Sequence, residues 1–515
     1  MQQLSKQSDV VFSAGTAKAY LLVLGGALLL YGLTCAPGVL WHDSALFAYR
    51  VWHNDIEGEM GLALAHPLYV MLGIALKYVP LGGLFYRLNI MSAVFGAVAV
   101  ANLFLLLRLW LGRNWPAVIG AVTLAVSWTF WQHAVIAEVC SLYAAQLLAE
   151  LIVLLQYTRT KRVSYLYLLG LLNGLAIANH LWAAIAFACY VVFVVLLLVR
   201  GRIGLKHLGG IALLWMIGAA PYEYLIVKNI ILSGDVRATL ASALFGRLWQ
   251  GAVLNTSISS KVVLENILFI LLNFPTPNIV LFFVAFCAIS KAPPPRSFVN
   301  VLMAILVLNF LFAFRYTVPD RHVFFLPFYC LAAALIGLGA DVFFRRYSRR
   351  VVPFAVLVLA LLPIPVYAVT PELAEKTYKP LGQRRQRPYR DEYTYFLQPW
   401  KTGYRGAQKF ADEALEMVEE NAVIYADSTV VHTLLYVQEA QRRRPDVKIV
   451  SQYYSSQNAP AFNEDTIKQL MQVSTVYVVS AVQGYCPKFI LENYDIVKRG
   501  VLYQVVEKGS DGSLL

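Results

Sequence analysis

A carboxylate stands where the first long apolar run of the chain ends. Asp43, in WHDSALFAYRVW, follows the run Tyr20–Tyr31. An ionised carboxylate at a membrane edge is costly unless a partner or a function compensates. Two roles fit it. One is general base catalysis on an acceptor hydroxyl, which needs a carboxylate in a partly dry site. The other is capping of a short helix over ALFAYRVW by Asp43 or Ser44.

Further polar residues recur beside later apolar runs. His66, before Pro67, faces a phosphate or sugar in one interpretation, and bonds to water or backbone at a helix start in the other. Glu138, in HAVIAEVCSLYA, must face a cavity or a partner, and its alternatives are a helix cap or a structural ion pair. The expected positioning residues around them are Asn89, His133, Asn179, His180 and Asp320. The alternatives for this group are helix capping, packing and pairing of Asp320 with Arg321.

Three arginines are candidates for binding a phosphate group. Arg87 lies in FYRLNIMSAVFGA, and Arg315 and Arg321 lie in FRYTVPDRHVFFLP. A guanidinium grips phosphate with two parallel hydrogen bonds, a geometry that lysine lacks. The alternative is that these side chains extend to the lipid headgroups. The basic run RRQRPYRD (384–391) has two interpretations as well, an anion-binding segment or a solvated linker.

The composition indicates that apolar segments must hold these residues in position. The 515 residues are 59% hydrophobic and 14% charged, which is too little charge for a soluble domain of this length. Apolar runs of nearly spanning length recur up to about residue 369. The net charge of +13 lies mostly in basic loops between these runs, so nucleic acid binding is not expected. The spacing of the six cysteines suggests neither a disulfide framework nor a metal site.

The apolar runs predict eleven helical spans. They are 20–36, 88–107, 116–132, 141–157, 164–180, 182–199, 208–226, 263–290, 298–314, 323–343 and 351–369, and 263–290 is also compatible with a broken or re-entrant helix. The dense basic loops all fall on one side, which the positive-inside rule makes cytoplasmic. The polar residues above then share the outer face. Residues 63–79 are predicted to form a helix lying in the outer interface.

The predicted domains are a transmembrane domain (1–369, with its first outer loop at 37–87), a basic and aromatic linker (370–405) and an extracytoplasmic α/β domain (406–515). In the last, helix-like Gly406–Glu419 precedes a strand at 422–426 and a helix at 429–441. Further strands are expected in VKIVSQ, TVYVVS and VLYQVVE. Strands that alternate with helices predict a largely parallel sheet.

The order of motifs resembles a family of bacterial membrane proteins of the GT-C class, long described as a domain of unknown function. The motifs are HDSALF, AHPLYVMLG, YRLNIMSAVFGA, WTFWQHAVIAEVCSLYA, GLAIANHLW and FRYTVPDRHVFFLP. The family is related to a eukaryotic O-mannosyltransferase that acts on receptor ectodomains. This chain departs from it at His42, where many relatives have glycine, and at Cys140, where tyrosine is usual.

The resemblance implies a GT-C fold and a glycosyltransferase that uses a polyprenyl-phosphate sugar on the outer face. Asp43 would be the base, with Glu138 and His66 also catalytic, and one-step displacement would invert the anomeric centre. No cofactor is expected, and no metal site is indicated, although Asp43 and Glu138 are compatible with sharing a divalent ion. The expected partners are the lipid-linked donor of mannose or a similar hexose, membrane lipids, and a protein Ser/Thr or glycan acceptor.

Two other functions remain open at this point. A transferase of the same class that modifies a glycolipid or polysaccharide would carry the same motifs. A flippase or transporter of lipid-linked sugars would instead place polar residues near the bilayer midplane and often shows internal repeats. The chain concentrates its polar residues at one face, which favours the transferase. The expected location is a bacterial cytoplasmic membrane, with the site and the C-terminal domain facing the periplasm or exterior.

Overall fold

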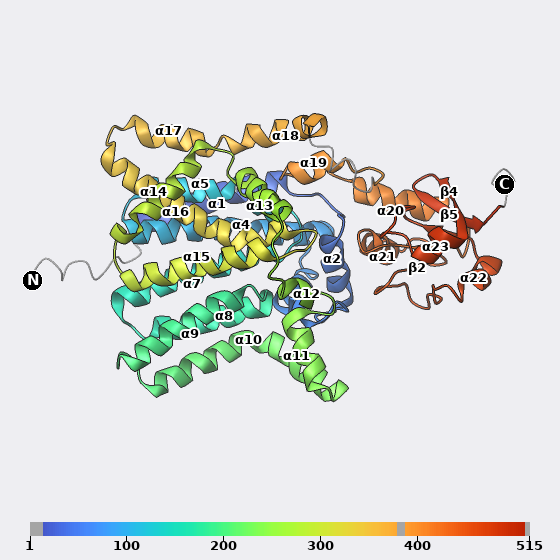
Figure 1. Ribbon diagram of the computed structural model, residues 1–515, viewed down its shortest axis with the longest axis horizontal. Helices are drawn as coiled ribbons and strands as arrows, with labels where there is room; N and C mark the ends of the chain where they lie inside the picture. Colours follow the sequence, from blue (N-terminus) through green and yellow to red (C-terminus); the bar gives the residue numbers. More distant parts are fainter. Residues whose placement is uncertain (1–13, 378–386, 510–515) are drawn as a thin grey trace, which may run out of the picture.

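The computed structural model describes residues 14–377 and 387–509. A bundle of long helices forms one part, and a smaller α/β domain sits at one end of it (Figure 1). The bundle helices are α1 (Ala14–Thr34), α4 (Leu84–Leu111), α5 (Asn114–Ala125), α6 (Trp128–Ala134), α7 (Cys140–Thr160), α8 (Ser164–Asn179), α9 (Ala183–Val199), α10 (Leu205–Ser233), α13 (Ser260–Asn273), α14 (Val280–Ala288), α15 (Arg296–Arg315), α16 (Leu326–Arg346), α17 (Val351–Ala360) and α18 (Pro363–Thr377).

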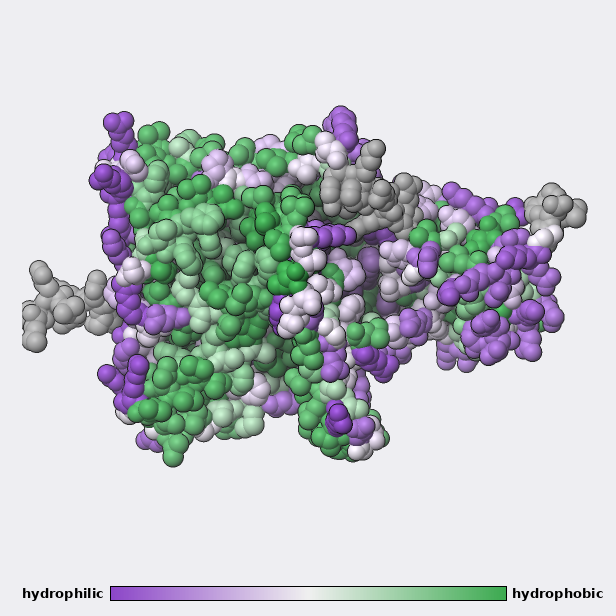
Figure 2. Space-filling view, viewed as in Figure 1, coloured by the Kyte–Doolittle hydropathy of each residue, from purple (hydrophilic) through white to green (hydrophobic). Residues whose placement is uncertain are grey.

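The surface of the bundle is that of a membrane protein. A broad apolar belt covers the helices, and a hydrophilic rim lies at the end opposite the α/β domain (Figure 2). Among the described residues, seven helices are long and apolar enough to cross a membrane, and the number rises to eight if one bent pair counts as a single span. Helix α16 is buried over nearly its whole length and forms the centre of the bundle.

All eleven predicted spans lie on helical segments, but 116–132 is divided between α5 and α6, and the number of spans stays a prediction. Helices α5, α8 and α9 are apolar and shorter than the usual spanning length. The segment predicted at 263–290 is broken: α13 and the stretch Pro277–Lys291 meet at an angle of 112°. Pro277 follows the break, where its missing amide hydrogen is tolerated at the start of the next helical segment.

Short helices connect the spans at the end of the bundle that carries the α/β domain. The first connection contains α2 (Asp43–His53), η2 (Leu62–Leu64) and α3 (Pro67–Leu76), so the helices expected at 45–52 and 63–79 are both present. Helices α11 (Val236–Phe245) and α12 (Gln250–Val253) follow α10, and η5 (Arg321–Phe325) precedes α16. This end of the molecule therefore holds most of its irregular structure.

The α/β domain contains α20 (Gly406–Met417), β1 (Val423–Tyr425), α21 (Val431–Ala440), β2 (Lys448–Val450), α22 (Ile467–Val473), β3 (Val476–Val478), α23 (Lys488–Asn493), β4 (Tyr494–Arg499) and β5 (Leu502–Glu507). The sheet order is β2-β1-β3-β5-β4. Strand β1 pairs in parallel with β2 and β3, whereas β5 pairs antiparallel with β3 and β4. The expected parallel sheet is thus confined to three strands, and β4 was not predicted.

Helices α8 and α10 approach closely through glycine. A Cβ at Gly174 would lie 2.1 Å from the carbonyl oxygen of Trp215, and one at Gly218 would lie 2.4 Å from that of Leu171. Small residues permit such contact between membrane helices, where van der Waals packing drives association. The indole of Trp215 also donates to Asn173 (3.1 Å), which donates in turn to Glu150 of α7 (3.3 Å). These contacts fix α8, whose last residues enter the candidate site.

Gly174→Ala should therefore destabilise the bundle. The added methyl group meets backbone that cannot rotate away, and overpacking of this kind costs about 1–3 kcal/mol. Gly209→Ala is the matched control, because Gly209 lies in α10 with nothing within 4 Å of an added Cβ. Thermal unfolding in detergent should show a lower midpoint for Gly174→Ala only. Equal midpoints would contradict the close packing of α8 and α10.

Candidate functional site

Asp43 is the first residue of α2, and it is solvent-accessible. The N-cap position belongs to His42, and no side-chain capping bond forms there, so the capping role considered for Asp43 or Ser44 is wrong. His42 has a φ of 54°, a conformation that L-residues other than glycine rarely adopt. The glycine usual in relatives would adopt it readily. Strain of this kind persists only where the surrounding structure imposes it.

The carboxyl group of Asp43 is desolvated although water can reach it. Desolvation, reinforced by the charge of Asp320, raises its pKa to about 6. We interpret this combination as a side chain that lines a recess surrounded by protein. Asp43 therefore titrates close to neutral pH, as a general base should.

Glu138 lies in the turn between α6 and α7 and shares the recess with Asp43. Its amide donates to Ser92 Oγ (3.1 Å), and the same hydroxyl donates back to its carbonyl (3.2 Å). Desolvation and the charge of Asp43 raise the pKa of Glu138 well above its ordinary value. The nearby Cys140 interacts electrostatically with Glu138, Asp320 and Asp43, so the three carboxyl groups all lie within electrostatic reach of this thiol.

Asp320 completes this carboxyl cluster, defined as Asp43, Glu138 and Asp320. It precedes η5 without making a side-chain capping bond, and its pKa is raised mainly by desolvation. Arg321, the partner considered for it, pairs instead with Glu265. Neither alternative for Asp320 therefore holds, and its charge acts on both Asp43 and Glu138.

Two asparagines hold the loops that carry the cluster. Asn89, fully buried, donates to the carbonyls of Ala36 (2.9 Å) and Gly38 (3.3 Å) and accepts from the amide of Ala137 (2.8 Å). It thus joins the segment before Asp43 to the turn of Glu138. Asn179 donates to the carbonyl of Val139 (3.2 Å) on the other side of that turn. Both residues hold protein loops in place, and their predicted role in positioning the substrate stays a prediction.

His66 and His180 form a neighbouring pair of imidazoles, with ring centres 4.9 Å apart. His66 Nδ1 donates to the carbonyl of Asn179 (2.7 Å), and desolvation lowers its pKa to about 4. His180 Nδ1 accepts from the amide of Trp182 (3.1 Å). In a neutral imidazole one nitrogen donates and the other accepts. Because Nδ1 of His66 donates, its Nε2 is an acceptor, and because Nδ1 of His180 accepts, its Nε2 is a donor. The pair can therefore offer both functions to a sugar hydroxyl without carrying charge.

The three arginines expected to bind phosphate already have protein partners. Arg87 donates through Nη1 to the carbonyls of Leu76 and Lys77 (2.8 Å each) at the end of α3. Arg315 Nη1 donates to the carbonyls of Val253 (2.5 Å) and Asn255 (2.8 Å). The buried Arg321 forms its ion pair with Glu265 of α13. These contacts assign the arginines to holding the connections together and do not support the expected role.

Other cations lie near the cluster, in a segment expected to be either anion-binding or solvated. Residues 384–386 lie outside the described residues, but Arg387 and Arg390 are buried and both pair with Glu392, at 3.0 and 2.9 Å. The solvated interpretation is therefore wrong for this part of the segment. Arg390 Nη1 has no hydrogen-bond partner within the described part of the chain.

Lys401 is a buried cation that the sequence did not single out. It follows α19 (Glu392–Leu397), and its ammonium group donates to the carbonyl of Gln398 (2.7 Å). It also lies 5.0 Å from the ring centre of Tyr395, a residue within electrostatic reach of Glu138. Desolvation, with a contribution from Arg390, lowers the pKa of Lys401 to about 7. His133, held by the carbonyl of Thr129 (2.8 Å), lies close to the same cation.

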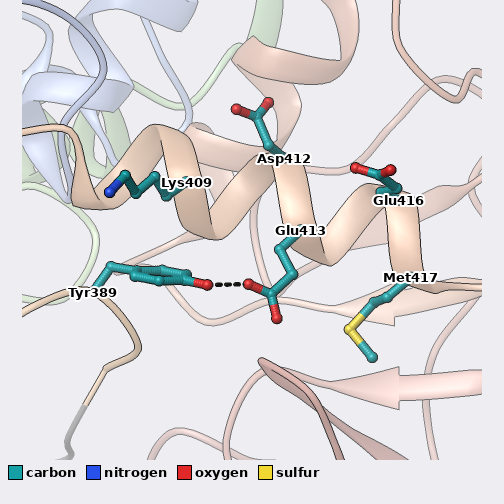
Figure 3. Close-up of a pocket in the computed structure, with 6 residues that line it drawn as sticks. All are labelled: Tyr389, Lys409, Asp412, Glu413, Glu416 and Met417. Carbon is teal, nitrogen blue, oxygen red and sulfur yellow. Dashed lines mark hydrogen bonds between the residues drawn. The ribbon is translucent and has the colours of Figure 1, made fainter.

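Two other features do not contribute chemistry. The open hollow in Figure 3 lies on α20 and is lined by Tyr389, Lys409, Asp412, Glu413, Glu416 and Met417. Its acidic groups are engaged with Tyr389 and Arg443. Within residues 14–377 and 387–509, no three His, Cys, Asp or Glu side chains are grouped to hold a metal ion. The carboxyl cluster, at the junction of the bundle and the α/β domain, is therefore the candidate site.

The bundle, the carboxyl cluster and the appended α/β domain define a polytopic membrane protein of the GT-C fold class. Residues 60–203 match the family described as "Protein O-mannosyl-transferase TMEM260 N-terminal domain". A mouse protein, "Protein O-mannosyl-transferase TMEM260", is 26% identical over 181 residues, which are 34% of this chain and 26% of the mouse protein. The alignment thus spans about a quarter of the length of that curated relative.

Solved structures with the same fold extend the comparison to nearly the whole chain. ArnT from Cupriavidus metallidurans bound to undecaprenyl phosphate superposes with a TM-score of 0.59 at 15% identity, covering 94% of this chain and 97% of ArnT. Its apo state gives a TM-score of 0.58 at the same identity, with 96% and 98% covered. The predicted GT-C fold and the relationship to protein O-mannosyltransferases are confirmed.

Proposed function

We propose that this protein is a glycosyltransferase that moves a monosaccharide from a polyprenyl-phosphate donor to an acceptor hydroxyl. The observation that carries the proposal is the carboxyl cluster at the junction of the bundle and the α/β domain. The family match supports hexose transfer to protein Ser/Thr, with mannose as the first sugar to test. The likeness to a structure bound to undecaprenyl phosphate supports the donor class.

Asp43 is the base in the proposed reaction. Its carboxylate removes the proton of the acceptor hydroxyl while the oxygen attacks the anomeric carbon. The new glycosidic bond forms as the bond from that carbon to the phosphate oxygen breaks, and the electron pair leaves with the polyprenyl phosphate. A single displacement inverts the anomeric centre. Asp43 is suited to this step because it is reached by water yet poorly solvated.

Glu138 takes a different role because it is less exposed than Asp43, and desolvation raises its pKa well above its ordinary value. Where two neighbouring carboxyl groups are driven apart in pKa, the group that ionises first is the base and the other keeps its proton. Glu138 then donates a hydrogen bond to a sugar hydroxyl or to the departing phosphate. Asp320 contributes charge to both groups, and the His66–His180 pair binds the sugar.

The donor phosphate is assigned to Lys401 and Arg390, in place of the three arginines expected at first. Both are buried, Lys401 has no carboxylate partner within the described residues, and Arg390 keeps one unpartnered donor. A buried cation is stabilised when an anion supplies the missing counter-charge. The phosphate diester carries one negative charge, which these two side chains can balance as it leaves.

The remaining parts of the proposal concern acceptor, orientation and cofactor. Protein Ser/Thr is the preferred acceptor, and a glycolipid or polysaccharide is the alternative that sugar analysis of protein and lipid fractions separates. A flippase would move the donor without modifying any acceptor. The side that carries the α/β domain is taken as the exterior. The reaction is proposed to need no metal, and transfer assays in EDTA test that point directly.

Asp43→Asn should reduce transfer by at least about 100-fold, the lower end of general-base effects. The amide retains the size of the side chain but cannot accept the proton. Purified protein in detergent, given synthetic polyprenyl-phosphate sugars and an acceptor peptide, provides the measurement. Asp235→Asn is the control, since Asp235 is an exposed helix cap of α11 on the same side of the bundle. Near-normal turnover of Asp43→Asn would remove Asp43 from the base role.

The pH dependence of transfer should report the carboxyl cluster. A base with a raised pKa works above that pKa, so kcat/KM should fall below a pH of about 6. Asp320→Asn removes a like charge that disfavours ionisation of Asp43. The fall of kcat/KM on the acid side should therefore occur at lower pH in Asp320→Asn. This variant should retain more activity at pH 5 than the wild type. A fall at the same pH, or at a higher one, would contradict the electrostatic coupling.

Lys401→Gln should weaken donor binding more than it slows chemistry. Loss of the counter-charge is expected to raise the KM for the polyprenyl-phosphate sugar about tenfold, as for one charge-assisted hydrogen bond. Lys409→Gln is the matched control, because Lys409 lies on the exposed face of α20 (Figure 3). Steady-state kinetics with varied donor concentration measure the effect. An unchanged donor KM in Lys401→Gln would place the phosphate elsewhere.

A further inference from the structure

Each of the three residues before Asp43 is held by the C-terminal part of the chain. Thr433 Oγ1, in α21, donates to the carbonyl of Leu40 (2.8 Å). Trp41 Nε1 donates to the hydroxyl of Tyr404 (2.6 Å). The amide of His42 donates to the carbonyl of Thr429 (3.1 Å). Leu40, Trp41 and His42 are therefore each hydrogen-bonded to the C-terminal part of the chain.

The bond from Thr433 is buried, so water does not compete for it, and the bond between Trp41 and Tyr404 is partly buried. Leu40 and Thr433 are fully enclosed, and Trp41 is 2% exposed. The indole of Trp41 also packs against Phe410 of α20, with ring centres 5.5 Å apart. Hydrogen bonds of this kind are expensive to break, because the buried partner is left unsatisfied.

The anchor itself is fixed inside the α/β domain. The amide of Thr429 donates to Asp427 Oδ1 (2.7 Å), and Arg387 Nε donates to the Thr429 hydroxyl (3.3 Å). The far end of α2 is attached to the same helix, because Glu439 of α21 accepts from Tyr49 (3.2 Å) and contacts His53 Nε2 (2.6 Å). Helix α2 is therefore clamped to α21 at both ends.

These contacts hold His42 in an unusual backbone conformation. Its positive φ directs the chain so that Asp43 opens α2, and the carbonyl of His42 accepts from the amides of Ala45 and Leu46 (3.0 Å each). A strained residue keeps its conformation only when its neighbours over-determine it. Here the neighbours are Thr429 on the amide side and the first turn of α2 on the carbonyl side.

We infer that the α/β domain is a working part of the catalytic site, with Thr433 as a positioning residue for Asp43. The inference rests on the proposed role of Asp43 as base. Thr433 touches no substrate in this scheme and acts through the carbonyl of Leu40, three residues before the carboxylate. The domain thus sets the distance between base and acceptor oxygen, and geometric errors of about 1 Å at this point are expensive in rate.

Thr433→Val tests the inference, since valine preserves the shape of threonine and removes only the hydroxyl. The expected result is a fall in kcat of about tenfold with the donor KM within about twofold of wild type, the pattern of an interaction that serves the transition state. Thr433→Ser, which restores the hydroxyl, should recover most of the rate. Hydrogen exchange of peptides covering residues 40–46 should be faster in Thr433→Val than in wild type.

Thr466→Val is the matched control. Thr466 also donates its hydroxyl to a backbone carbonyl, that of Ala461 (2.9 Å), but this bond is exposed and Thr466 is only half-buried at the start of α22. Its kcat and the exchange of residues 40–46 should match wild type. If Thr433→Val fails to fold, Tyr404→Phe is the second variant. It removes the hydrogen bond to Trp41 and should also lower kcat, by a smaller factor.

The outcomes separate this inference from the proposed function. Wild-type kcat in both Thr433→Val and Tyr404→Phe would overturn the inference while leaving the transferase intact. A loss that is equal in Thr433→Val and Thr466→Val would overturn it as well, by showing a general effect of the domain. Absence of transfer in the wild-type protein would refute the proposed function, and unchanged exchange at residues 40–46 would then refute the positioning independently.

Discussion

One amide side chain sets the separation of the two principal carboxyl groups. Asn89 is buried in α4 and bonds at once to the segment that leads to Asp43 and to the turn that carries Glu138. A backbone segment that crosses the end of a membrane bundle must satisfy its polar groups, since lipid offers none. The requirement is met here by one side chain that serves two loops. The distance between Asp43 and Glu138 is thereby built into a transmembrane helix.

Charge is distributed at this end of the molecule according to what each group already binds. Arg87, Arg315 and Arg321 are engaged with carbonyls or a glutamate and stabilise the connections between helices. The carboxyl cluster, by contrast, collects like charges in a poorly solvated recess. Such an arrangement is unfavourable for stability and favourable for proton transfer. The cations of Arg390 and Lys401 lie on the side of the recess formed by the segment after the bundle.

The apolar runs predicted the helices of the bundle, and the polar residues at their ends identified the loops of the site. The sequence did not reveal which guanidinium groups were already occupied. Arg87 and Arg315 bind backbone carbonyls, which every residue provides, and the partner of Arg321 is Glu265, 56 positions away in the chain. Strand β4 was missed because Tyr494–Arg499 mixes charged with apolar residues at a sheet edge. Lys401 was missed because its burial depends on neighbours such as Tyr395 and Trp400. A short basic and aromatic stretch of sequence does not predict that burial.

The attachment of Leu40 to Thr433 joins residues 393 positions apart in the chain. Synthesis makes the loop of Asp43 early and the helix that holds it near the end. Contacts of such long range form late, after the elements between them have folded. The bundle can therefore enter the membrane and pack with its reactive carboxylate still unplaced. Under the proposed function, the nascent protein would stay inert towards lipid-linked donors until its α/β domain has folded and docked.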